Sequence, residues 1–488
     1  MLMTTRTLVA QSPRLTPRRV PLASKLINLT ALVLFVVLVA QAFFRQGLGS
    51  WSVGIVYILY DSFLLVFTAA HTWRLMRVVV PQPVAALANS SVSQREQRAT
   101  LGVIVAAHNE AGVLGITVDR LVAQDNPPDL IVIADDGSSD ATPDAMMRLF
   151  GLAMPDPGEI SDPAPALPSL RWLRLAHGGK ARALNEAIER IDTDIVLTVD
   201  ADTLLDPGAL AAMRAAFVAE PDLVAATGVL TPICGPSLTE RTFQWFQTYE
   251  YVRNFLSRYA WMQEGGLLLI SGAFAAFRRD AVVRVGGFDP ACLVEDYELI
   301  HRLYRHSADN DLGWKVRVIG GATARTDAPA SVMAFLRQRR RWFGGFLQTH
   351  WWNRDMVGNA HFGHLGTRMM PVKSLDTLQP VYGMAAFIIL IALVALGKFY
   401  IAFPILMVML AKVVFDLAYH LWSIRLYERW TNQPERMGLM RAVLASIVEP
   451  FSFQLLRHAG AIWGWWTFLT GNESWGRQKR TAIEAVAR

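Results

Sequence analysis

Long apolar stretches constrain this chain more than any other feature of its sequence. Residues 26–44 and 51–70 carry almost no charge, and two further apolar stretches cover residues 378–396 and 399–422. Each is long enough to cross about 30 Å of hydrocarbon as an α-helix. Only 18% of the residues are charged, against about 25% in an average soluble domain, and 52% are hydrophobic. The sequence therefore predicts a chain that is partly embedded in a lipid bilayer.

Basic residues beside the apolar stretches predict the orientation of the chain. Those that precede the first stretch are Arg6, Arg14, Arg18, Arg19 and Lys25. Because basic residues are retained on the cytoplasmic side, we expect a cytoplasmic N-terminus, and Arg74 and Arg77 mark the return to the cytoplasm after the second stretch. A cleaved signal peptide is disfavoured because the first stretch lacks a clear small-residue cleavage site and a second span follows.

The last apolar segment, residues 441–470, has two interpretations. Glu449-Pro450 and Arg457-His458 interrupt it, so it forms either one kinked span or an interfacial hairpin. Basic residues in the tail favour a cytoplasmic C-terminus, whereas a single last crossing places the tail outside. The number of spans therefore stays open.

Charge and cysteine content exclude some classes of partner and site. The net charge is +6, but the basic residues cluster beside apolar stretches, which favours a membrane surface over nucleic acid. Cys234 and Cys292 lie in no ligand-like cluster, which excludes a disulfide scaffold and a thiolate metal site.

The predicted order is a basic N-terminus (1–25), two spans (26–70), a cytoplasmic catalytic domain (71–330), interfacial helices (331–376), C-terminal spans (377–470) and a tail (471–488).

The central region has the alternating pattern of an α/β domain. Three short runs rich in aliphatic residues predict strands at 101–107, 130–134 and 195–199. Helical patterns at 111–124 and 180–190 alternate with them, which predicts a mostly parallel sheet with helices on both faces. The proline-rich segment 151–169 is predicted to be a surface loop.

Polar clusters follow all three predicted strands, where ligands bind in sheets of this kind: His108-Asn109-Glu110, Asp135-Asp136-Gly137 and Asp200-Ala201-Asp202. The two carboxylates of the last cluster can hold Mg2+ or Mn2+ and so bring the metal to a diphosphate. The middle cluster is also compatible with an ordinary turn, in which Ser139 or Asp140 caps the next helix.

Three later motifs suggest transfer chemistry, and each has a simpler alternative. His177-Gly178-Gly179-Lys180 opens a helix and suits a phosphate group, although a flexible loop with a solvated lysine explains it equally well. Glu295-Asp296 supplies a general base, or simply acids at a helix N-terminus. Gln338-x-x-Arg341-Trp342 lies in a basic run that a helix at the membrane surface explains only in part, because the adjacent aromatic residues remain unexplained.

Taken in order as DDG, DxD, an [TE]D acid and QxxRW, these motifs resemble those of the family 2 membrane glycosyltransferases. That group contains the cellulose, hyaluronan, chitin and poly-N-acetylglucosamine synthases, and the resemblance covers residues 101–342. It implies a GT-A-type nucleotide-sugar-binding domain inserted between transmembrane helices of the bacterial inner membrane. It also implies a UDP-sugar donor, a growing polysaccharide as acceptor, and a divalent metal, with an export or regulatory subunit as a further partner.

The resemblance also assigns roles to individual residues. Those expected at the donor nucleotide are Asn109, Glu110, Asp135, Asp136, Lys180, Asp200 and Asp202. Those expected at the acceptor and the diphosphate are Ser271, Gly272, Glu295, Gln338, Arg341 and Trp342. Asp202, together with Asp200, is the expected metal ligand, and Asp296 is the expected catalytic base.

The same resemblance predicts an inverting transfer that forms a β-linkage. Valine precedes Glu295-Asp296 where cellulose synthases have threonine, and the segment 178–185 looks more like the poly-N-acetylglucosamine and hyaluronan branch. Two alternatives remain: transfer of a single sugar to a lipid or short acceptor, and a degenerate membrane sensor that binds nucleotide or polysaccharide. A transporter is disfavoured because the spans are few and the largest segment is soluble.

Overall fold

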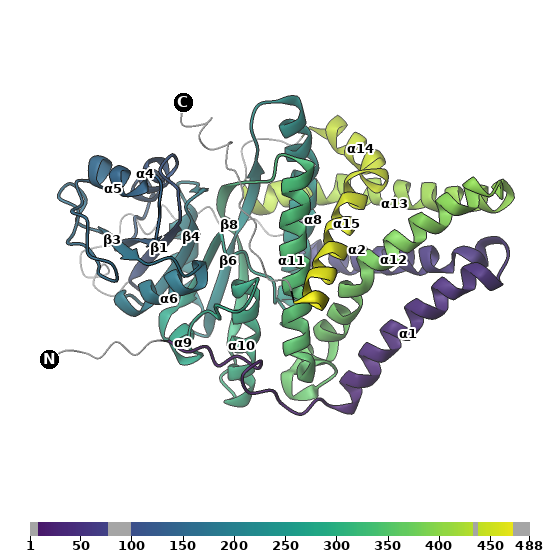
Figure 1. Ribbon diagram of the computed structural model, residues 1–488, viewed down its shortest axis with the longest axis horizontal. Helices are drawn as coiled ribbons and strands as arrows, with labels where there is room; N and C mark the ends of the chain where they lie inside the picture. Colours follow the sequence, from purple (N-terminus) through teal and green to yellow (C-terminus); the bar gives the residue numbers. More distant parts are fainter. Residues whose placement is uncertain (1–7, 77–98, 433–437, 472–488) are drawn as a thin grey trace.

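The computed structural model describes residues 8–76, 99–432 and 438–471, which form an α/β domain beside a set of long helices (Figure 1). Arg6, Arg77 and the basic residues of the tail lie outside the described residues, so their predicted roles in orientation are not addressed. Cys234 and Cys292 are both free thiols, as predicted.

One eight-stranded sheet forms the centre of the α/β domain, in the order β3-β2-β1-β4-β7-β6-β8-β5. Its strands are β1 (Leu101–Ala107), β2 (Leu130–Asp136), β3 (Leu170–Leu175), β4 (Ile195–Asp200), β5 (Thr203–Leu205), β6 (Leu223–Ile233), β7 (Phe274–Arg278) and β8 (Lys315–Asp327). The first four in this order are parallel, as are β6 and β8, whereas β7 is antiparallel to both neighbours and β5 to β8. The predicted α/β class and mostly parallel sheet are therefore confirmed.

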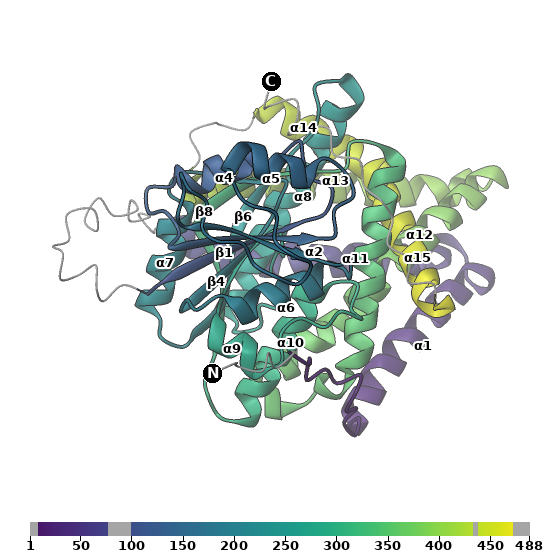
Figure 2. The same ribbon diagram turned by 60° about the vertical axis from the view of Figure 1, so that its left-hand side comes forward.

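Helices cover both faces of this sheet, which explains why β1, β2 and β4 are nearly continuous apolar runs. In both views α4 (Leu114–Val122) and α5 (Thr142–Phe150) lie on one side of the parallel strands, and α6 (Lys180–Arg190) lies on the other (Figure 2). The domain also contains α7 (Ala209–Ala219), α9 (Arg279–Arg284) and α10 (Glu295–Asp309).

Two details of the predicted helices are wrong. The helix predicted at 111–124 is shorter at both ends, since residues 111–113 form a turn and α4 ends at Val122. The N-cap of α5 is Ala141 and not Ser139 or Asp140. Asp140 nevertheless accepts a hydrogen bond from the amide of Thr142 at 2.9 Å, so it stabilises the same turn.

The loop predicted at residues 151–169 has no regular helix, but it is not wholly on the surface. Ile160 forms an isolated bridge with Leu173 of β3, and Leu152 and Ala164 are buried. The loop therefore protects the edge strand of the sheet.

Four helices in the described part of the chain are long and apolar enough to cross a membrane. They contain α1 (Leu22–Phe44), α2 (Ser52–Thr72), α12 (Met370–Ala395) and α13 (Phe399–Thr431). They correspond to the four apolar stretches of the sequence, but they extend further. In particular, α12 begins inside the predicted interfacial segment 331–376, and α1 begins inside the predicted basic segment 1–25.

The last apolar segment is broken, as the Glu449-Pro450 interruption predicts. It consists of α14 (Leu439–Val448), a short 3-10 turn (Glu449–Phe451) and α15 (Phe453–Thr470). α15 packs closely along α11 (Val332–Trp352), where a Cβ atom on Gly464 would lie 2.5 Å from the carbonyl oxygen of Arg340. Small residues allow such close contact between helices. α15 is not among the four helices above.

The segment before α1 lies against the α/β domain. The guanidinium of Arg14 makes two hydrogen bonds to Asp289, at 2.7 and 3.0 Å, and Arg18 makes two to Asp309. Asp289 precedes α10 in the sequence, and Asp309 is the last residue of that helix. These arginines, which the sequence suggests only as signals of orientation, therefore connect the first membrane helix to the element that carries Asp296.

Candidate active site

A cavity of about 460 Å³ lies where the sheet meets α10, α11 and α8 (Leu238–Gln263). Every predicted site residue from Lys180 onward lines it: Lys180, Asp200, Asp202, Ser271, Gly272, Glu295, Asp296, Gln338, Arg341 and Trp342. The predicted residues before Lys180, namely Asn109, Glu110, Asp135 and Asp136, do not line it. Segments that are far apart in the sequence therefore meet at one site.

Three carboxylates line the sheet side of the cavity. Asp200 is the last residue of β4, Asp202 follows it, and Asp327 ends β8. The amide of Asp327 donates to the carbonyl oxygen of Asp202 at 3.3 Å. Burial and the charges of Asp200 and Asp327 hold the pKa of Asp202 well above its usual range. A hard divalent cation would offset this repulsion, so the residues fit the predicted Mg2+ or Mn2+. Asp327 is absent from the sequence prediction.

Lys180, the first residue of α6, contacts these acids. Its ammonium group forms an ion pair with Asp200 and lies 3.8 Å from Glu295. Burial alone would lower the pKa of Lys180, but Asp200 and Glu295 raise it, so the side chain keeps its charge. Burial in turn raises the pKa of Glu295. The alternative of a solvated lysine in a flexible loop is therefore wrong, since the ammonium group is held at the cavity.

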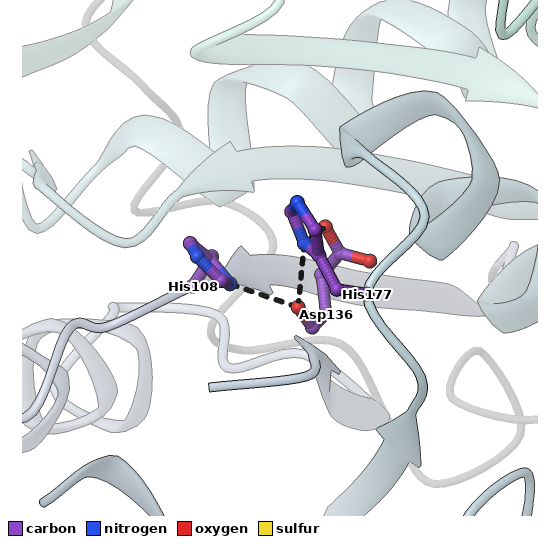
Figure 3. Close-up of side chains that lie close together, drawn as sticks. All are labelled: His108, Asp136 and His177. Carbon is purple, nitrogen blue, oxygen red and sulfur yellow. Dashed lines mark hydrogen bonds and ion pairs between the residues drawn. The ribbon is translucent and has the colours of Figure 1, made fainter. Parts of the chain in front are cut away.

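Asp136 connects the ends of β1 and β2 to the loop before α6 (Figure 3). Its carboxylate accepts hydrogen bonds from the amides of Gly178 at 2.7 Å and Gly179 at 2.9 Å. Its carbonyl oxygen pairs with Nδ1 of both His108 and His177, whose rings stack with centroids 4.5 Å apart. The glycine amides that the sequence suggests for a phosphate thus bind Asp136 in this structure.

His108 and His177 belong to predicted motifs but have no role in the sequence prediction. With Asp136 they offer three metal-ligand atoms that lie within 4.8 Å of one another. Imidazole nitrogen is a ligand typical of zinc, copper or nickel, whereas Mg2+ and Mn2+ prefer oxygen. The carboxylates Asp200, Asp202 and Asp327 are therefore the better match for the predicted metal.

Asn109 and Asp135 shape the turn between β2 and α5. Oδ1 of Asn109 accepts hydrogen bonds from the amides of Ser139 at 2.8 Å and Asp140 at 3.2 Å. Asp135 is buried and accepts from the amide of Ser138 at 2.9 Å. Glu110 is buried, and its amide donates to Thr142 at 2.9 Å. The structure therefore places these residues together, where β1 and β2 end and outside the lining of the cavity.

Two backbone amides orient the carboxylate of Asp296. Oδ2 accepts from the amide of Gly272 at 2.6 Å, and Oδ1 accepts from the amide of Tyr297 at 2.8 Å. Gly272 is next to Asp200 because β7 pairs antiparallel with β4. Asp296 is also in the first turn of α10, so its role as a helix N-terminal acid and its role as a base are compatible.

Replacing Gly272 with alanine should misplace this carboxylate. A Cβ atom at that position would lie 2.8 Å from Oδ2 and 3.1 Å from Cγ of Asp296, so the side chain must move. Because a displacement of about 1 Å can reduce a rate about 100-fold, we expect a loss of that order in the turnover number. Initial rates over a range of donor concentrations will measure it, and the KM for the donor should change little. A turnover number close to that of the wild type contradicts this view of Asp296.

The QxxRW motif lies on α11 and is fixed by a buried arginine. The guanidinium of Arg339 is 4.3 Å from the ring centre of Trp342 and 4.4 Å from that of Phe335. It also forms a buried ion pair with Glu250 at 2.5 Å. Gln338 accepts a hydrogen bond from Arg339 at 3.1 Å. The alternative of a solvated basic helix is therefore wrong for Arg339, which the sequence prediction does not include among the site residues.

The cavity continues beyond Trp342 among α2, α12, α13 and α15. Its lining there includes Asp61 of α2, Asp376 of α12, Tyr419 of α13 and Trp465 of α15. The cavity therefore extends from the candidate site into the interior of the helical part of the protein.

The chain matches known glycosyltransferases in sequence and in structure. Residues 98–345 match the family described as "Glycosyltransferase like family 2". Poly-beta-1,6-N-acetyl-D-glucosamine synthases of Staphylococcus aureus and Staphylococcus epidermidis are 25% and 26% identical, over 59% and 52% of this chain. The chain spans 63% and 56% of the length of these relatives.

A solved structure shows a similar fold over most of the chain. It is a mannosyltransferase of Pyrobaculum calidifontis in complex with GDP-Man and Mn2+, with a TM-score of 0.52 and 21% sequence identity. The similarity covers 82% of this chain and 99% of that one, which supports a GT-A fold flanked by apolar helices. Since the family match covers half of the chain and contains the DxD, Glu295-Asp296 and QxxRW motifs, this protein belongs to the family 2 glycosyltransferases.

Proposed function

We propose that this enzyme polymerises a β-linked polysaccharide from a UDP-sugar at the cytoplasmic face of the bacterial inner membrane. The observation that supports this most is the single cavity that joins Asp202, Asp296 and Trp342 and continues among the membrane helices. Such a path suits an acceptor that grows at one end and leaves through the membrane, in association with export. The similarity to poly-beta-1,6-N-acetyl-D-glucosamine synthases favours N-acetylglucosamine as the first sugar to test.

In the proposed reaction, Asp296 takes the proton of an acceptor hydroxyl as that oxygen attacks the anomeric carbon of an α-linked donor. The bond to the nucleotide diphosphate breaks in the same step, so the configuration inverts. Lys180 and Arg341 offset the charge of the leaving diphosphate. Asp200, Asp202 and Asp327 would hold Mg2+ or Mn2+, which supplies further charge stabilisation when bound.

The remaining predicted residues position the two substrates. The nucleotide-binding part of the site is shaped by Asn109, Glu110, Asp135 and Asp136. The amide of Gly272 positions the carboxylate of Asp296. Trp342 presents a flat aromatic face on which a pyranose ring can stack, with Gln338 one turn away on the same helix. Arg339 fixes the tryptophan ring through its cation–π contact.

The size of the product tests this proposal. Purified protein in lipid nanodiscs is supplied with radiolabelled UDP-sugars and a divalent cation, and the product is separated by gel filtration. We expect long chains with one of the donors, and no product with the Asp296→Asn variant. Addition of one sugar would support transfer to a lipid or short acceptor, and nucleotide binding without turnover would support a sensor.

A further inference from the structure

The membrane side of the cavity contains several cations, and nearly all of them are paired with acids. The pairs are Arg339–Glu250, Arg457–Glu250, Arg253–Glu449 and Lys373–Asp376. Arg258 of α8 differs from them: Nε and Nη1 are shielded from solvent, and no described residue accepts a hydrogen bond from either. Its guanidinium packs 4.4 Å from the ring centre of Phe255. A shielded cation without an acid is costly unless a ligand compensates it.

Arg258 also lies close to the reacting groups. It lines the same cavity as Asp296 and Trp342 and is only half-buried, because part of the side chain faces that cavity. The negative charge of Asp296 raises the pKa of Arg258, although the two side chains form no ion pair. Burial lowers the pKa of Arg258 to about 10, so the side chain remains charged near neutral pH. An acceptor bound in this cavity therefore meets the charge of a cation as well as that of Asp296.

We propose that Arg258 is the anion-binding residue of the acceptor site and that the acceptor carries an acidic group, a carboxylate or a phosphate. Because Nε and Nη1 are shielded, Nη2 is the nitrogen through which this guanidinium can donate a charge-assisted hydrogen bond to either group. A neutral hydroxyl could accept one such bond but would leave the buried charge uncompensated. This inference rests on the proposed transfer site and adds to it a chemical class of acceptor. Because a chain of N-acetylglucosamine alone carries no acid, the acidic group would belong to the molecule on which such a chain starts.

Two sources can supply the acidic group: a uronic acid residue in an oligosaccharide, or the phosphate of a polyprenyl phosphate lipid. Equilibrium binding to the full-length protein in nanodiscs separates them and needs no turnover. The probes are a neutral gluco-oligosaccharide, a glucuronate-containing oligosaccharide of equal length, and farnesyl phosphate. We expect one acidic probe to bind more tightly than the neutral one, and its identity names the source.

Matched variants connect this preference to Arg258. Arg258→Gln should weaken the preferred acidic probe by about 30-fold or more, because a buried charge pair loses one partner. Arg258→Lys should retain an intermediate affinity, and binding of UDP should stay unchanged in both variants. Arg284→Gln, on the exposed surface of α9, is the control. If Arg258→Gln fails to bind UDP, its donor site is damaged, and the affinity of Arg258→Lys for the acidic probe is used in its place to test the proposal.

Three results would overturn the proposal. The first is equal affinity of the wild type for acidic and neutral probes. The second is an equal loss of affinity for both kinds of probe in Arg258→Gln, and the third is an unchanged affinity of that variant for the acidic probe. Failure of the proposed function is a separate observation, since it appears as the absence of turnover with every UDP-sugar while probe binding is still measured.

Discussion

Replacing Asp296 with asparagine should lower the rate of sugar transfer by at least about 100-fold, because proton transfer by a positioned group contributes a factor of that order or more. The amide is nearly the same size as the carboxylate but cannot take the acceptor proton. Its oxygen can still accept from the amide of Gly272 or Tyr297, so the side chain should stay close to its native position. The fold and the nucleotide end should therefore be unaffected.

Release of UDP from a turned-over donor measures this effect, and equilibrium binding of UDP shows that the donor site is intact. Asp280→Asn is the matched control, since that carboxylate is 62% exposed on α9 and should be dispensable. Loss of UDP binding together with activity would indicate a structural role for Asp296. Activity equal to that of the control would exclude it as the base.

Much of this architecture is readable from local sequence patterns. The four long helices follow from apolar length, and β1, β2 and β4 follow from short aliphatic runs that are buried on both faces. The clusters at their carboxyl ends meet because parallel strands begin and end together. For the same reason, Asp136 and Asp200 fall at one edge of the sheet, as the sequence predicts.

The rest depends on contacts between distant segments, which no local pattern encodes. Asp327 meets Asp202 only because β8 pairs with β5. Arg339 reads as one of several surface arginines, and only the fold places Glu250, 89 residues away in the chain, beside it. Arg258 belongs to no motif, and only the fold shows that no described residue accepts a hydrogen bond from its Nε or Nη1.

Removal of divalent cations should abolish transfer, and Asp202→Asn should lower the rate by about 100-fold or more even when Mn2+ or Mg2+ is in excess. A preorganised charge that stabilises a leaving group contributes a factor of this order. The test is UDP release after treatment with a chelator, followed by titration of each cation. Asp222→Asn, at an exposed carboxylate paired with Lys315, is the control.

Stability should respond to Asp202→Asn in the opposite direction from activity, which separates loss of the metal site from loss of the fold. Burial and the charges of Asp200 and Asp327 raise the pKa of Asp202 in the folded protein. An acid whose pKa is raised by folding stabilises the protein at low pH and loses that contribution as the pH rises through the raised value. Without metal, the wild type should therefore lose stability over this pH range, while the asparagine variant should not.

Added Mn2+ should raise the melting temperature of the wild type more than that of the variant, because only the wild type has the full set of carboxylates. A variant that is less stable than the wild type without metal at neutral pH would show that the three acids do not repel one another, and would contradict the assignment of the site.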